Sequence, residues 1–359
     1  MTKEIRVAIV GLGNCASTLV QGLTYYRNVE SRDIVPGLMH TELGGYKIRD
    51  IKVVAAFDVN KLKIGRDIGE AIFAHPNVAE KFADVKKMGV EVSPGPIMDG
   101  VAPHMFESFH VYGNGVQPVE PVKVLQDSGA EILINYLPVG SREAARFYAQ
   151  ACLDAGCAMI NCIPEFIASD HEWSNRFLEK KLPIAGDDVK SQLGATILHR
   201  AIVNLMLERG VKIEETYQLN VGGDTDFENM LDENRLASKR ISKTQAVTSL
   251  SNYEFPTRIG PSDWVSFLKD QKICYIFVKG RKFGDRPITI DVKLSVEDSP
   301  NSGGVVIDVI RGTKLALERK IGGALEGISS YAFKHPPVNV TDEIARKWAQ
   351  DFIDGKKER

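Results

Sequence analysis

A glycine-rich segment near the start of the chain constrains the possible folds more than any other feature. The segment Gly11–Ala16, GLGNCA, follows the apolar run Arg6–Val10 and opens the helical pattern Cys15–Tyr26. A G-x-G-x-x-G/A sequence between a strand and a helix is typical of dinucleotide-binding domains. We therefore predict a Rossmann-type nucleotide site at this turn.

Each residue type in the segment suits contact with a pyrophosphate. Gly11 permits a tight turn, Gly13 lets the backbone approach closely, and Ala16 is small enough for the helix to pack on the strand. Free N–H groups in the first helical turn, where Asn14 and Cys15 lie, favour a phosphate. The alternative is a glycine turn in an α/β domain that binds nothing.

An acidic residue follows the second expected strand. Asp58 comes after Val53–Phe57 and is expected to accept hydrogen bonds from the adenosine ribose. A carboxylate there would repel a 2′-phosphate, which favours NAD over NADP. Asp58 lies much further along the chain than in the compact motif, so Tyr25–Ile51 must be an insertion. Asp58 could instead be a turn residue that ends the strand.

Gly140 and Ser141 lie between the expected strand Ile132–Tyr136 and the expected helix Arg142–Ala155. The carboxyl ends of strands face the cofactor in such sheets, and Ser is a common helix N-cap. Cofactor contact and simple capping by Ser141 both fit this pattern.

Short β-branched runs alternate with helical patterns through the first half of the chain, which favours a mostly parallel sheet covered by helices. The expected strands are 6–10, 53–57, 132–136, 158–161 and 184–185, and the expected helices are 15–26, 142–155 and 170–181. The predicted fold class is α/β, a Rossmann-like doubly wound parallel sheet.

The pattern changes near Ser191, where a second domain is expected. Two successive strands joined by a turn at Gly284–Asp285 indicate an antiparallel sheet. The expected elements are helix 195–209, strands 216–221, 273–279 and 288–296, and helices 302–318 and 341–352. We predict that residues 1–195 and 301–359 form a discontinuous NAD-binding domain, with residues 196–300 as an inserted α+β catalytic and oligomerisation domain.

The composition is that of an ordinary globular protein. Lys and Arg number 45 against 47 Asp and Glu, a formal net charge of -2, so nothing in the charge balance favours nucleic acid or a membrane surface. The chain opens without a signal-peptide pattern, and no apolar run is long enough to span a membrane. We expect a cytoplasmic protein.

The cysteines are too few and too irregular for a disulfide framework. They are Cys15, Cys152, Cys157, Cys162 and Cys274. The even spacing of the middle three fits no zinc pattern, so we expect buried thiols.

Two polar clusters flank the change in pattern. Residues 186–196, GDDVKSQLGAT, put small and polar residues at a helix start, which suits a phosphate or a plain capped helix. Residues 220–230 lead into Ser238–Thr244, SKRISKT. Lys239 and Lys243 are four apart and would share one face of a helix. Such like charges repel, so they indicate either a solvated face or an anionic sugar phosphate.

With these motifs in order, the chain resembles the myo-inositol-1-phosphate synthase family, in its shorter prokaryotic branch. The resemblance runs from Gly11 to Pro337 and rests on GLGNCAS (11–17), GDDVKS (186–191), LNVGG (219–223), SKRISKT (238–244), DSPNS (298–302) and SYAFKHPP (330–337).

The resemblance implies an enzyme with tightly bound NAD that converts glucose 6-phosphate to inositol 1-phosphate. C5 is oxidised, C6 loses a proton, an internal aldol addition onto C1 closes the ring, and the hydride is returned. Members of the family are typically homotetramers.

The resemblance also implies site residues. The catalytic set is Asp226, Lys239, Lys243, Lys272 and Lys334; the substrate set is Ser191, Gln192, Ala195, Thr196 and Asn220. Asp188, Asp298 and Ser299 join the cofactor residues, and Asp298 is a candidate ligand for a divalent or monovalent cation that some members show there.

The chemistry of the residues agrees with this family. Ammonium groups stabilise the enolate that forms beside a C5 ketone, and crowded lysines lower one another's pKa values, so one could act as a base. We expect Lys239, Lys272 or Lys334 near the enolising centre and Lys243 near the phosphate. Two departures from the family are Asp224-Thr225, where some members have amides, and Ala16 in place of a third glycine.

Two other functions stay open. An NAD-dependent dehydrogenase of another small phosphorylated or amino-acid substrate would accumulate NADH. A non-catalytic NAD-sensing or scaffold protein would have no reason to keep Asp226 and the four lysines together.

Overall fold

The computed structural model describes residues 3–30, 34–113 and 115–359. Met1 and Thr2, and residues 31–33 of the expected insertion, lie outside the described residues. In the part that is described, no helix combines the length and apolar character needed to cross a membrane.

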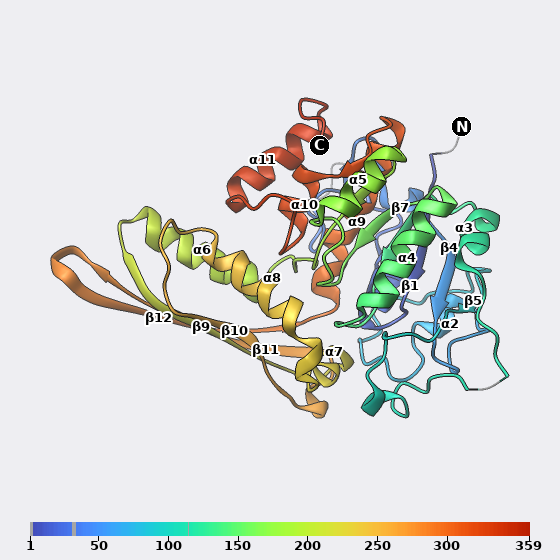
Figure 1. Cartoon of the computed structure of the whole chain (residues 1–359), viewed down its shortest axis with the longest axis horizontal. Helices are drawn as coiled ribbons and strands as arrows, with labels where there is room; N and C mark the ends of the chain where they lie inside the picture. The colour runs from blue at the N-terminus through green and yellow to red at the C-terminus, as the bar shows by residue number, and fades with distance from the viewer. Residues whose placement is uncertain (1–2, 31–33, 114) are drawn as a thin grey trace.

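The first domain is built on a seven-stranded parallel sheet in the order β13-β8-β7-β6-β1-β4-β5 (Figure 1). Its strands are β1 (Ile5–Val10), β4 (Ile51–Asp58), β5 (Val92–Pro94), β6 (Ile132–Asn135), β7 (Ala158–Asn161), β8 (Pro183–Ala185) and β13 (Gly323–Ala324). The strand order reverses at β1, which pairs with β4 on one side and β6 on the other. Ligands bind at such a reversal in doubly wound sheets.

Helices cover both faces of this sheet because its strands are apolar on both sides. They are α1 (Asn14–Tyr25), α2 (Ile68–Ala71), α3 (Pro121–Ser128), α4 (Arg142–Ala155), α5 (His171–Glu179), α9 (Pro300–Glu318), α10 (Glu326–Ala332) and α11 (Asp342–Ile353). In β1, Val7 and Ile9 pack with α1 and α9, whereas Ala8 and Val10 pack with α3 and α4. This two-sided cover is the doubly wound arrangement expected from the sequence.

The insertion between α1 and β4 contains a two-stranded hairpin, β2 (Glu42–Leu43) with β3 (Tyr46–Lys47). It lies against α9, where Arg311 donates to the carbonyl oxygens of His40 and Tyr46. This segment packs on the first domain, and its length accounts for the large sequence separation between the glycine turn and Asp58.

The second sheet is mixed rather than antiparallel throughout, in the order β10-β9-β11-β12. Its strands are β9 (Lys212–Gly222), β10 (Thr257–Trp264), β11 (Gln271–Lys282) and β12 (Arg286–Glu297). The expected antiparallel pair β11–β12 is present, but the sequence pattern did not indicate β10, which runs parallel to β9. All four strands lie between residues 212 and 297.

Helices cover one face of this second sheet. They are α6 (Ala195–Glu208), α7 (Thr225–Asn229) and α8 (Ala237–Thr248). Val203 of α6 and Val247 of α8 pack on Cys274, Ile276 and Val278 of β11. The opposite face leaves Tyr217, Leu219 and Tyr275 between 38% and 43% exposed. In Figure 1 the sheet extends away from the first domain and ends in the β11–β12 hairpin.

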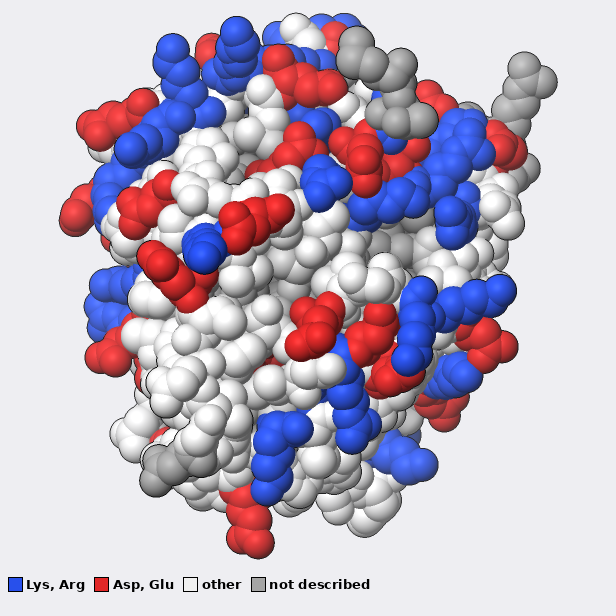
Figure 2. All heavy atoms as spheres, turned by 90° about the vertical axis from the view of Figure 1, so that its right-hand side faces the viewer, with Lys and Arg blue, Asp and Glu red and all other residues white. Residues whose placement is uncertain are grey.

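Charges on the surface are mixed. On the face shown in Figure 2, basic and acidic side chains are interspersed. Among the described residues visible there, no broad area has the single sign that attracts a polyanion.

Candidate active site

A cavity lies at the carboxyl edge of the parallel sheet and is lined by residues of both sheets' domains. The predicted residues that line it are Gly11, Gly13, Asn14, Cys15, Asp58, Asp188, Ser191, Asp226, Lys239, Lys243, Lys272, Asp298, Ser299 and Lys334. The position after β1, at the reversal of strand order, is where a nucleotide site was expected.

The glycine turn has the shape that a pyrophosphate needs. Gly11 has φ +85°, and a Cβ there would lie 2.7 Å from the carbonyl oxygen of Tyr136. A Cβ on Gly13 would meet nothing, and no side chain caps α1, which begins at Asn14. The first N–H groups of α1 therefore remain available to an anion. Ala16 is fully buried in the core instead of lining the cavity.

Polar side chains hold this turn and also line the cavity, and two of them, Lys63 and Asn77, had no signal in the sequence. Lys63 Nζ donates to the Leu12 carbonyl oxygen at 2.7 Å, and Asn77 Nδ2 donates to the same oxygen at 2.9 Å. Asp58 Oδ2 accepts from Leu12 N at 2.8 Å. Hydrogen bonds thus hold both the backbone N–H and the carbonyl oxygen of Leu12. Burial lowers the pKa of Lys63, against the attraction of Asp58.

Asp58 is engaged mainly with backbone. Besides Leu12 N, its carboxylate accepts from Val59 N at 2.7 Å and Asn60 N at 2.9 Å. It still lines the cavity. A ribose contact by Asp58 stays a prediction.

Ser141 occupies the N-cap position of α4, but its side chain does not cap the helix. Its Oγ turns back to the Pro138 carbonyl oxygen, and no side chain of the N-cap position bonds to α4. Asp99 takes that role from a distant loop, accepting from Glu143 N at 2.7 Å and Ala144 N at 2.9 Å. Neither Ser141 nor Gly140 lines the cavity. Gly140, at φ +85°, lies under the side chain of Arg235.

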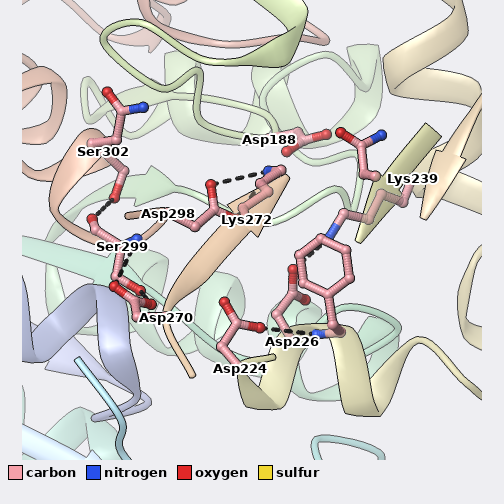
Figure 3. A network of polar contacts seen from close by, with 12 residues as sticks. Asp188, Asp224, Asp226, Lys239, Asp270, Lys272, Asp298, Ser299 and Ser302 are labelled. Atoms are coloured by element: carbon pink, nitrogen blue, oxygen red, sulfur yellow. Dashed lines mark hydrogen bonds and ion pairs between the residues drawn. The ribbon is translucent and has the colours of Figure 1, made fainter. Parts of the chain in front are cut away.

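Three of the predicted lysines pair with carboxylates in the cavity, and Figure 3 labels two of these pairs, Lys239 with Asp226 and Lys272 with Asp298. Lys239 Nζ is 2.5 Å from Asp226 Oδ2, Lys272 Nζ is 2.9 Å from Asp298 Oδ2, and Lys334 Nζ is 2.8 Å from Asp188 Oδ1. They come from α8, β11 and the segment after α10.

In two of these pairs the lysine lowers the pKa of its carboxylate partner. Burial alone would raise the pKa of both Asp188 and Asp298, but Lys334 holds Asp188 below its ordinary value and Lys272 does the same for Asp298. Burial also disfavours the charged form of Lys272, yet Asp298 raises its pKa above the usual range.

Lys243 differs from the other three lysines. It is 4% exposed and lines the cavity, but within the described part of the chain it forms no ion pair. Burial, followed by the positive charges of Lys239, Lys272 and Lys334, lowers its pKa well below the usual value. Lys243 is therefore the group of this cluster best suited to be a neutral amine.

Backbone pairing brings two distant motifs together. Asp187 and His335 exchange two N–H···O bonds of 3.0 Å, Lys334 N donates to Asp188 O at 2.7 Å, and Lys190 N donates to Ala332 O at 2.8 Å. Val189 and Phe333 form an antiparallel bridge. Lys334 therefore reaches Asp188 because its own backbone pairs with that segment.

Buried polar side chains form a chain of hydrogen bonds that ends at Asp187, the neighbour of Asp188. Asn135 and Asn161 end β6 and β7; Asn135 Nδ2 donates to Asn161 Oδ1 at 2.9 Å, and Asn161 Nδ2 donates to Asp187 Oδ1 at 2.7 Å. Asp187 also accepts from the N–H groups of residues 167–169. Burial raises the pKa of Asp187 to about 6.

Two further aspartates stand beside the lysines. Asp224 begins α7, accepting from Phe227 N at 3.0 Å, and burial followed by Asp226 and Asp298 raises its pKa well above the ordinary value. Asp270 accepts from Ser299 Oγ at 2.6 Å, and burial raises its pKa to about 7. Asp270 thus fixes the residue that follows Asp298 (Figure 3).

The predicted substrate residues are only partly brought together. Ser191 lines the cavity, whereas Gln192, Ala195, Thr196 and Asn220 do not. Asn220 Nδ2 donates to the Gly260 carbonyl oxygen at 2.9 Å within the second sheet. Asn301 holds the loop 191–194, because its side chain bonds Leu193 N at 3.0 Å and Leu193 O at 2.7 Å.

The described residues give no support for a metal centre. No group of three His, Cys, Asp or Glu side chains among them could hold an ion. Both oxygens of Asp298 face Lys272 Nζ, at 3.0 and 2.9 Å, so an ammonium group stands where a cation was considered. The five cysteines are free thiols, and all except the half-buried Cys15 are buried.

Comparison with known proteins decides the family. A family model described as myo-inositol-1-phosphate synthase matches residues 194–299, which contain the whole second sheet. An inositol-3-phosphate synthase of Mycolicibacterium smegmatis is 50% identical over 359 residues, covering 98% of both chains. The chain belongs to the inositol-3-phosphate synthase family.

A second inositol-3-phosphate synthase is similar to this chain over nearly its whole length. The Corynebacterium glutamicum enzyme is 49% identical, with 98% of this chain and 99% of that one covered. The solved structure of a Thermotoga maritima protein related to myo-inositol-1-phosphate synthase has a TM-score of 0.81 at 24% identity, covering 98% of each chain. The latter likeness bears on the fold alone, and it agrees with the doubly wound domain and separate second sheet.

Proposed function

We propose that this protein converts glucose 6-phosphate to inositol 1-phosphate, with NAD reduced and reoxidised in each turnover. The observation that carries the proposal is the convergence of four lysines on one cavity whose other end is a glycine turn. Membership of the inositol-3-phosphate synthase family supports the same reaction.

The glycine turn fits NAD. The uncapped start of α1 and the open space at Gly13 suit a pyrophosphate, with Asn14 and Cys15 in the same turn. When bound, NAD would accept a hydride from C5 of the sugar and later return it. Asp58, Asp188, Asp298 and Ser299 line the same cavity and are proposed to contact the cofactor.

The paired lysines are proposed to stabilise the enolate. After C5 is oxidised, removal of a proton from C6 places negative charge on the C5 oxygen. Lys239, Lys272 and Lys334 carry preorganised positive charge in a buried site, where it acts strongly on a developing oxyanion. The carboxylates that pair with them, including Asp226, orient the ammonium groups.

The division of labour differs from the one expected from sequence. Lys243 was expected near the phosphate, but it is the lysine whose pKa is lowered well below the usual value. We propose that its neutral amine accepts the C6 proton, since a lowered pKa favours the deprotonated amine that a general base needs. The proton can then be returned to the C1 oxygen as the ring closes.

The substrate phosphate is proposed to lie by Ser191 and the start of α6. No side chain caps that helix, and Gly194 precedes it. Its first turn, with Ala195 and Thr196, offers free N–H groups to an anion. Gln192 and Asn220 stay predictions as further substrate contacts.

The test is incubation of the purified protein with glucose 6-phosphate and NAD, followed by phosphorus NMR and by absorbance of NADH. Inositol 1-phosphate without lasting NADH is expected. Stoichiometric NADH would instead point to a simple dehydrogenase, and no change in either signal would refute the conversion of glucose 6-phosphate and leave a dehydrogenase of another substrate as the alternative. Repeating the assay with a chelator and with added ammonium or divalent salts tests the need for a cation.

We further propose a homotetramer in the cytoplasm. The uncovered face of the second sheet exposes Tyr217, Leu219 and Tyr275, and contiguous exposed apolar side chains mark interaction surfaces. Sedimentation equilibrium tests the assembly: a monomer at micromolar concentration would contradict it.

A further inference from the structure

Asp342, the first residue of the C-terminal helix α11, bridges two buried cations. Its Oδ1 lies 3.1 Å from Lys190 Nζ, and its Oδ2 accepts from Arg200 Nε at 2.7 Å. Lys190 and Arg200 are 4% and 1% exposed. One carboxylate outside the cavity thus balances two positive charges that are closed off from water.

The first cation, Lys190, belongs to the loop that carries Asp188 and Ser191. Its Nζ also donates to the Ser330 carbonyl oxygen at 2.8 Å. Burial lowers the pKa of Lys190 to about 8, while Asp342 acts in the opposite direction. Asp342 therefore stabilises the charged side chain that anchors this loop.

The second cation, Arg200, lies on α6 and reaches the helix that carries the active-site lysines. Its NH2 group donates to Val340 O at 2.7 Å, and its NH1 group donates to Ala246 O on α8. Ala246 lies one turn after Lys243. Earlier on the same helix, Ser242 donates to Asp188. The loop and α8 are therefore connected twice. Inside the cavity Ser242 bonds Asp188, and outside the cavity Asp342 joins Lys190 of the loop to Arg200, which bonds α8.

We propose that Asp342 is a positioning residue, which sets the distance between the Asp188–Ser191 loop and the lysine helix α8. Without its charge, Lys190 and Arg200 would be two buried, uncompensated cations that repel each other. The loop and α8 would then move apart, and the lysines would lose their alignment with the substrate. The kinetic consequence rests on the proposed function, whereas the structural consequence does not.

The test compares Asp342→Asn with Glu343→Gln. Both variants remove one negative charge from the first turn of α11, so both lose the same interaction with the helix dipole. Glu343 is exposed, which makes it a matched control. The measurements are kcat and KM for glucose 6-phosphate, NAD affinity, and hydrogen exchange of residues 186–196 and 237–248.

For Asp342→Asn we expect a roughly tenfold or larger fall in kcat/KM, with a raised KM, because a small displacement of positioned groups is costly. Exchange should accelerate in both segments. NAD affinity should fall by a smaller factor than kcat/KM, because Asp188 moves with the loop whereas the glycine turn is held separately by Lys63, Asn77 and Asp58. Asp342→Glu should recover part of the activity, and Glu343→Gln should resemble the wild type.

Kinetics and exchange that are the same in Asp342→Asn and Glu343→Gln would overturn the proposal. So would a loss of NAD affinity with faster exchange throughout α1, because that result means general unfolding. If the wild type converts no glucose 6-phosphate, the proposed function fails, and the exchange comparison alone still decides the role of Asp342.

Discussion

Lys239 and Lys243 lie one turn apart on α8, yet only Lys239 has a carboxylate partner among the described residues. Lys239 Nζ is 2.5 Å from Asp226, whereas Lys243 faces the positive charges of the neighbouring lysines, which with burial lower its pKa. One helix therefore presents a lysine with a carboxylate partner and a lysine with a lowered pKa to the same cavity. Four predictions follow from this pairing and from the contacts around it.

Lys243→Met should abolish turnover without loss of stability. Removing a general base is expected to lower kcat by at least roughly 100-fold. The pKa of Lys243 is lower in the folded protein than in the unfolded chain, so a protonated Lys243 destabilises the folded state. This destabilisation becomes smaller as the pH rises toward the ordinary lysine pKa. The variant should thus match or exceed the wild-type Tm, with the largest gain at low pH. A clear fall in Tm at neutral pH would contradict an unpaired Lys243.

Lys272→Ala should lose cyclisation and stability together while NAD stays bound. The substitution leaves the Asp298 carboxylate, which is 20% exposed, without its ammonium partner, and this costs about 1–3 kcal/mol, less than for a fully buried pair. Urea unfolding at neutral pH measures this loss, and phosphorus NMR measures the product. Lys282→Ala, at the exposed end of the same strand, is the control. Near-normal turnover of Lys272→Ala would remove Lys272 from the catalytic set.

Asp270→Asn should flatten part of the pH dependence of stability. The folded pKa of Asp270 is raised to about 7, so the folded state holds this proton more tightly than the unfolded chain. The contribution of Asp270 to the free energy of unfolding therefore falls as pH rises from about 4 to about 7. The difference in unfolding free energy between variant and wild type should move in favour of the variant across that window. A constant difference would refute the shift.

Lys63→Met should weaken NAD binding. The substitution removes a hydrogen bond to the Leu12 carbonyl oxygen and a partner of Asn77, so the glycine turn loses part of its fixed shape. A loss of about 1 kcal/mol or more corresponds to a fivefold or larger rise in Kd, measured by calorimetry. The exposed Lys61→Met is the control. Equal affinities of the two variants would show that Lys63 is dispensable.

Elements with a strong repeating pattern could be predicted from the sequence. Arg142–Ala155 and Ala158–Asn161 match the observed α4 and β7, because apolar periodicity there agrees with burial. The strand β10 could not be predicted, since Gly260 and Pro261 argue against a strand. Pro is tolerated there because β10 is an edge strand of the second sheet.

The sequence indicated which residues form the site, but it did not indicate which of them pair with one another. The family resemblance indicated Lys239, Lys243, Lys272 and Lys334, which all line one cavity. Which lysine lacks a carboxylate depends on contacts between segments up to 146 residues apart, such as Lys334 with Asp188. For the same reason Asp99, Lys63 and Asp342 gave no local signal.

The pairing of residues 187–190 with residues 332–335 also sets an order of assembly. A chain still being synthesised can form β1, the glycine turn and much of the parallel sheet from its earlier residues, since domains fold as their segments emerge. Lys334 cannot meet Asp188 until residue 335 has been made, because His335 supplies two of the backbone bonds that place it. Nascent chains can therefore acquire a nucleotide-binding turn early, but the reactive centre is completed only after both halves of the first domain and the whole inserted sheet have been translated.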